Sequence, residues 1–129
     1  MRSASAYTSM QGVTMDGNRA FEELYVRLAR WTAEAAELED PKRYEQLIDK
    51  CVSLLGYMDP VIDPSTGREV ALKVLSLNRF AINTLIKAKQ PSGRPEVVGL
   101  APVFYAMADI FKTIAEAAER AFAGDAKAS

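Results

Sequence analysis

The placement of glycine and proline most constrains what this sequence of 129 residues can fold into. Most of these residues gather in short stretches at positions 12–17, 41, 60–67, 91–95 and 124. In the long segments between them, apolar residues recur every three or four positions, which is typical of amphipathic α-helices. We therefore predict an all-α protein, an antiparallel up-down-up-down four-helix bundle with short links.

The first two helices have clear starting signals. We expect the first over residues 17–38 with Asp16 as its N-cap, because a carboxylate can accept from the unpaired amides of a first turn. The second should begin at Asp40 and Pro41, since Asp suits the N-cap and Pro suits the first helical position.

The apolar faces of these two helices identify expected core residues. Trp31 lies on the apolar stripe of the first helix, and Cys51 and Leu54 lie on that of the second. Because large apolar residues and cysteines at such positions are usually buried, we expect Trp31 and Cys51 to be largely buried and Leu54 to belong to the core.

The third and fourth helices are bounded in the same way. Residues 66–69 match a capping box, in which Thr and Glu satisfy backbone donors at a helix start, and this helix should continue to about residue 88. The fourth should span about residues 95–122, with Gly124 as its stop. Pro102 cannot donate to the carbonyl of Val98, so we expect a kink or a fresh helix start there.

The third predicted helix is apolar nearly all round. Its apolar residues are Val70, Ala71, Leu72, Val74, Leu75, Leu77, Phe80, Ala81, Ile82, Leu85 and Ile86. A helix with this much apolar surface either lies at the centre of the fold or presents a docking face to another molecule. In so short a chain few helices can be fully surrounded, so both alternatives stay open.

The composition excludes several classes of functional site. The sequence has no histidine, which removes histidine general bases and Ser-His-Asp or Cys-His nucleophile systems. Its one cysteine, Cys51, cannot form an intrachain disulfide or a Cys-rich zinc site. With 16 Lys+Arg against 17 Asp+Glu, the net charge of -1 provides no overall attraction to nucleic acid or anionic lipid. We expect a non-enzymatic protein with no catalytic residue, metal or cofactor, and no nucleic-acid or membrane partner.

The chain is expected to form a single domain over residues 1–129, with an N-terminal segment over 1–16 and a flexible C-terminal tail over 124–129. The start of the chain lacks the apolar stretch of a secretory signal. The longest uncharged run, residues 97–108, is shorter than the roughly twenty residues that span a bilayer. These features predict a cytoplasmic protein.

Short motifs along most of the chain resemble the FliS family of flagellar export chaperones. The matching positions are Ala6-Tyr7, Val13-Thr14, Leu24-Tyr25, Arg30-Trp31, Gly67-Arg-Glu69 and Leu77-Asn-Arg-Phe80. The sequence departs from the family pattern at Val26-Arg27, at Asp16-Gly17 and at Phe111, where that family often has Trp. The resemblance therefore extends over the helix layout but is incomplete at these positions.

The resemblance implies a cytoplasmic chaperone, a monomer or weak homodimer, that binds the C-terminal amphipathic segment of flagellin in an apolar groove and prevents premature polymerisation. It implies that the N-terminal segment covers part of the groove and that residues of the first and third helices form its wall. The implied partner-binding residues are Tyr7, Met10, Val13, Leu24, Tyr25, Leu28, Leu77 and Phe80. The alternatives are a helical adaptor or oligomerisation domain without a flagellar role, and a small all-α enzyme.

Overall fold

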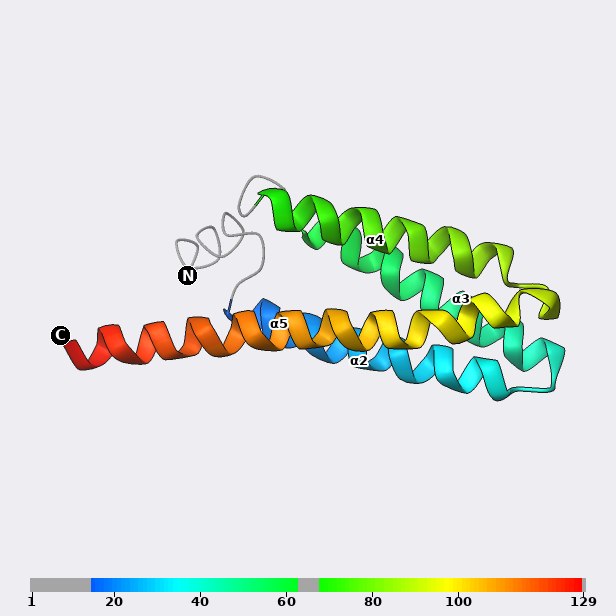
Figure 1. Cartoon of the computed structure of the whole chain (residues 1–129), viewed down its shortest axis with the longest axis horizontal. Helices are drawn as coiled ribbons and strands as arrows, with labels where there is room; N and C mark the ends of the chain where they lie inside the picture. The colour runs from blue at the N-terminus through cyan, green and yellow to red at the C-terminus, as the bar shows by residue number, and fades with distance from the viewer. Residues whose placement is uncertain (1–14, 63–67, 129) are drawn as a thin grey trace.

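The computed structural model describes residues 15–62 and 68–128. Four α-helices make up most of this part of the chain: α2 (Met15–Glu37), α3 (Pro41–Met58), α4 (Arg68–Lys87) and α5 (Arg94–Ala128) (Figure 1). There are also two short 3-10 helices. η1 (Asp59–Val61) follows α3, and η2 (Pro91–Gly93) precedes α5. No strand occurs in the described ranges, so the predicted all-α class is confirmed.

The most extensive helix–helix interface joins α2 to α5, which lie side by side in Figure 1. Four aromatic rings fill it: Phe21 packs edge-on against Phe111 at a centroid distance of 5.2 Å, and Tyr25 stacks on Phe104 at 6.2 Å. Phe21 precedes Tyr25 in α2, whereas its partner Phe111 follows Phe104 in α5, so the two helices are antiparallel. Each aromatic pair adds about 0.5–1.5 kcal/mol beyond its buried area.

The hydrophobic core extends from this pair to one face of α3 and one face of α4. α3 contacts both α2 and α4, whereas α4 has only a small interface with α5. The largest fully buried apolar side chains of the described residues are Tyr25, Tyr44, Phe104, Leu28, Ile48, Leu55, Met58 and Leu85. The core is therefore built mainly around α2 and α5, and α4 lies at its edge.

The predicted start of α3 is confirmed, but that of α2 is wrong. The Asp40 side chain accepts a hydrogen bond from the Lys42 amide at 3.0 Å, and Pro41 is the first residue of α3. α2 already includes Asp16, so this residue is not its N-cap. Contacts with α5 outweigh local helix-breaking signals in this first turn: Asn18 is buried, and Arg19 bonds to α5 through Glu119.

α5 is longer than the sequence predicts. It continues through Gly124, the expected stop, and ends at Ala128. A glycine inside a helix costs only about 1 kcal/mol relative to alanine, and alanines on both sides of Gly124 favour helix. Pro102 also lies inside α5, so no new helix starts there. Pro102 and Val98 both lie on the exposed side of α5, so water can reach this turn of the helix.

Three expected core residues differ in their burial. Cys51 is fully buried, as predicted, and burial raises the pKa of its thiol to about 12. Trp31 and Leu54, in contrast, are only partly buried and pack against the margin of the core. Both side chains pack against the core cluster and also line a furrow between α2 and α3, so they lie at the margin of the core and not at its centre.

A buried polar chain links α4 to α2. The Tyr25 hydroxyl donates to Asn78 Oδ1 at 2.7 Å, and Asn78 Nδ2 lies 3.5 Å from Asp59 Oδ1 of η1. Asn78 is fully buried, so its amide would lose hydrogen bonds if α4 shifted along the core. Burial also raises the pKa of Tyr25, which keeps this hydroxyl a donor.

One stretch of α5, Arg94–Gly124, is long and apolar enough to cross a membrane by length and composition. The most apolar window of this stretch is 39% buried within the protein. Val97, Leu100, Phe104 and Phe111 of α5 are core residues, and the core helix of a water-soluble protein meets the same criteria. Packing on α2 thus accounts for the buried part of the hydropathy of α5.

We predict that Asn78→Ala lowers the free energy of unfolding by about 1–3 kcal/mol, because the Tyr25 hydroxyl would be left buried without its acceptor. Urea denaturation followed by circular dichroism measures this. Asn83→Ala is the matched control, because Asn83 lies on the exposed face of the same helix and its removal should change stability by less than about 0.5 kcal/mol. Equal losses for the two variants would contradict the role of the polar chain.

The Cys51 thiol should react slowly with a thiol reagent in the folded protein. Burial raises its pKa from 9.0 to about 12, which lowers the thiolate fraction by on the order of a thousandfold near neutral pH. With a disulfide reagent that releases a coloured thiolate, absorbance at pH 8 measures the rate of labelling. The urea-unfolded chain is the control. Equally fast labelling of the folded and unfolded protein would show that Cys51 is open to solvent.

Candidate functional site

α4 exposes more large apolar side chains than a peripheral helix needs. Phe80 is 61% exposed, Val70 51%, Ile86 49% and Leu72 45%. α4 makes its main contact with α3, so most of its circumference remains uncovered by the described residues. Of the two alternatives for this helix, central position or docking face, the structure therefore excludes the central position.

Two of these exposed side chains, Leu72 and Phe80, come together with the partly buried Leu77. Leu72, Leu77 and Phe80 line a shallow surface hollow of about 530 Å³ on the outer side of α4, together with Glu69, Lys73 and Ser76. We call this surface the α4 hollow. The six lining residues recur at spacings of three and four, which places them on one helical face. At its edge, Lys73 pairs with Glu69 at 3.5 Å, so the apolar floor has a charged rim.

The end of α4 next to η2 lies close to the start of α5. Thr84 and Lys87 of α4 line a small pocket of about 250 Å³ together with Glu96 of α5, so these sides of the two helices face each other. Phe80 lies one helical turn before Thr84. In Figure 1, α4 and α5 meet at η2 and separate toward the other end of α4.

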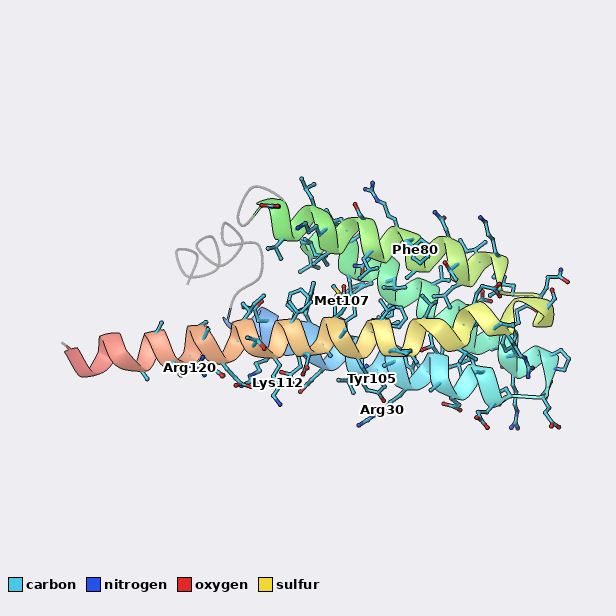
Figure 2. All side chains as sticks on the ribbon, in the orientation of Figure 1. Arg30, Phe80, Tyr105, Met107, Lys112 and Arg120 are labelled. Carbon is cyan, nitrogen blue, oxygen red and sulfur yellow. The ribbon has the colours of Figure 1, made fainter. Side chains whose placement is uncertain are left out.

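Two further exposed apolar residues belong to the facing side of α5. Figure 2 shows Met107 on the side of α5 toward α4, and Tyr105, Lys112 and Arg120 on the other side. Ile110 and Ile114 follow Met107 by one and two turns, and they are 45% and 37% exposed. Exposed apolar side chains therefore occur on both α4 and α5.

The structure brings together only some of the residues that the sequence suggested for partner binding. Leu77 and Phe80 share the α4 hollow, whereas Tyr25 and Leu28 are fully buried in the core and present no surface. Leu24 is partly buried against the core. The remaining three candidates, Tyr7, Met10 and Val13, lie outside the described residues.

Sequence reasoning did not single out Leu72, Ile110 and Ile114 as binding residues. Leu72 lies two helical turns before Phe80, a signal that was available in the sequence. Ile110 and Ile114 carried no comparable signal, because their exposure depends on how far α4 separates from α5.

A second surface surrounds Trp31. This open furrow of about 970 Å³ runs between α2 and α3, and its apolar part is formed by Trp31, Leu38, Leu47 and Leu54. Its charged side chains are Glu34, Arg43, Asp49 and Lys50. Two acids and two bases give no net preference for the charge of a ligand. Trp31 also borders a smaller hollow of about 440 Å³ with Arg27 and Arg30.

The described residues offer no group that could hold a metal ion through three or more His, Cys, Asp or Glu side chains. The two most strongly perturbed buried groups, Cys51 and Tyr25, are both stabilised in their protonated forms by burial. Neither has the lowered pKa that activates a nucleophile. The chemistry available at the surface of α4 is therefore apolar contact with a charged rim.

Comparison with protein-family models, with curated proteins and with solved structures finds no match to this chain. The case for a function therefore depends on the geometry of α4 and on the motifs in the sequence.

Proposed function

We propose that this protein is a cytoplasmic chaperone that binds an amphipathic helical segment of its client on the α4 hollow. The observation that carries the proposal is the grouping of Leu72, Leu77 and Phe80 on an uncovered helix face. An amphipathic helix recognises such a surface through apolar residues spaced by three and four positions. The FliS-like motifs make the C-terminal segment of flagellin the proposed client.

The energetics of this surface suit a chaperone that must later release its client. Burial of apolar area contributes about 25 cal/mol per Å². Part of that gain offsets the cost of ordering the client segment, so a shallow hollow gives moderate affinity. The charged rim of Glu69 and Lys73 can fix the direction of the bound helix without adding much affinity. Binding of this kind needs no cofactor or nucleotide.

We also propose that the four helices form an antiparallel up-down-up-down four-helix bundle within a single domain. The antiparallel packing of α2 on α5 supports this arrangement, as do the contacts of α3 with both α2 and α4. Short connections between successive helices favour antiparallel neighbours. In such a bundle the small α4–α5 interface leaves the α4 hollow accessible to a client.

Phe80→Asp should weaken binding of the cognate flagellin's C-terminal peptide at least about tenfold, because a carboxylate would be desolvated in the apolar hollow. Isothermal titration calorimetry measures the affinity. Tyr57→Asp is the matched control, since Tyr57 is an aromatic residue of α3 with 72% exposure, outside the α4 hollow. Circular dichroism checks that both variants fold.

Retained affinity in Phe80→Asp would refute the α4 hollow as the client site. If the unaltered protein binds no flagellin peptide but self-associates, and Phe80→Asp abolishes that association, the surface is an oligomerisation site. Analytical ultracentrifugation over a range of protein concentrations separates this outcome from client binding.

Client binding should show a negative heat-capacity change and a weak dependence on salt, since it buries apolar surface and few charges. Titrations at several temperatures and at two ionic strengths measure both quantities. A loss of affinity of about tenfold or more between low and physiological salt would instead identify a site dominated by charge.

A further inference from the structure

The helix that carries the α4 hollow has an excess of positive charge. α4 contains the basic residues Arg68, Lys73, Arg79 and Lys87 but only one acidic residue, Glu69. The whole chain has a net charge of -1, so this excess is local to α4. Positive charge beside an exposed apolar surface favours a partner that carries the opposite charge.

Two of these bases can pair with a partner. Lys73 already pairs with Glu69 at 3.5 Å, whereas Arg79 and Lys87 form no ion pair with any described residue. Both side chains are exposed. Lys87 lines a small pocket with Glu96 of α5, but no ion pair joins these two residues. The charges of Arg79 and Lys87 are therefore not neutralised by direct contact within the described structure.

Arg79 and Lys87 continue the exposed face of α4 beyond the hollow. Arg79 follows Ser76 by three residues and Lys87 follows Phe80 by seven, which are spacings of one helical face. The two bases are eight residues apart, or about 12 Å along the helix axis. A helix docked lengthwise on the hollow can therefore reach both bases with flanking side chains that are about seven or eight residues apart.

We propose that the segment bound on the α4 hollow is an amphipathic helix with acidic residues beside its apolar stripe, and that these residues pair with Arg79 and Lys87. This inference rests on the proposed function and adds the charge of the client. A second copy would bring its own excess of bases against this one, so like charges disfavour self-association through this face. Exposed ion pairs add little affinity, so they select among clients and do not drive binding.

Two synthetic helical peptides with the same apolar stripe test the proposal. One has Glu at two positions beside the stripe, about eight residues apart, and the other has Lys at the same positions. Fluorescence anisotropy of the labelled peptides measures their affinities for the full chain at low and at physiological salt. We expect the Glu peptide to bind several times more tightly than the Lys peptide, with the smaller difference at physiological salt.

Arg79→Glu combined with Lys87→Glu should reverse this preference. The matched control is Lys112→Glu combined with Arg120→Glu, which changes the net charge equally on the side of α5 away from α4 (Figure 2). The control should keep the preference of the unaltered protein. Circular dichroism checks the fold of each variant. If the reversed pair does not fold, Arg79→Gln combined with Lys87→Gln should abolish the preference.

Equal affinities for the two peptides, both lost in Phe80→Asp, would overturn the acidic client but leave the α4 hollow as the binding site. A preference that persists in the α4 variant, or that the α5 control removes equally, would also overturn the proposal. If neither peptide binds, the inference is wrong, and the flagellin titration separately decides the proposed function. If only vesicles of phosphatidylcholine and phosphatidylserine bind, and Phe80→Asp abolishes this, the occupant is an anionic bilayer and the proposal is wrong.

Discussion

The fold depends on the aromatic contact between α2 and α5. Phe21 and Tyr25 of α2 interlock with Phe104 and Phe111 of α5, and the surrounding core is assembled on this pair. Because α5 contributes its most apolar stripe to α2, little of that stripe remains for α4. The two best-packed helices thus leave α4 at the edge, where α3 and the buried Tyr25–Asn78 hydrogen bond hold it.

This arrangement explains why α4 carries exposed apolar residues. A helix that is apolar on every side would be stable at the centre of a larger core, but the described residues cover only the side of α4 with Val74, Asn78, Ala81 and Leu85. The remaining apolar area is maintained at the surface, where it favours aggregation unless something binds it. Binding of an amphipathic helix is a function that requires such a surface.

The sequence predicted best what depends on neighbouring residues alone. Asp40 and Pro41 start α3 because the cap and its amide are two residues apart. Gly124 did not end α5, and Asp16 did not cap α2, because packing between distant segments outweighed these local signals.

The candidate site was harder to predict than the fold. Helical periodicity identifies the apolar face of a helix, but it does not identify which element packs on that face. Tyr25 and Phe80 are both apolar positions on helices with FliS-like motifs, yet one is fully buried and the other is 61% exposed. Tyr25 is buried because α5 packs on α2, whereas Phe80 is exposed on a helix that has only a small interface with α5, and no single stretch of sequence encodes either contact.

The central claim is that α4 is the binding surface, and an NMR titration tests it most directly. A ¹⁵N-labelled sample of the full chain is titrated with the C-terminal peptide of the cognate flagellin. The largest amide shift changes should fall on residues 69–80 of α4, with smaller changes at Ile110 and Ile114. Changes centred on the Trp31 furrow, or no changes at saturating peptide, would contradict this account of the protein.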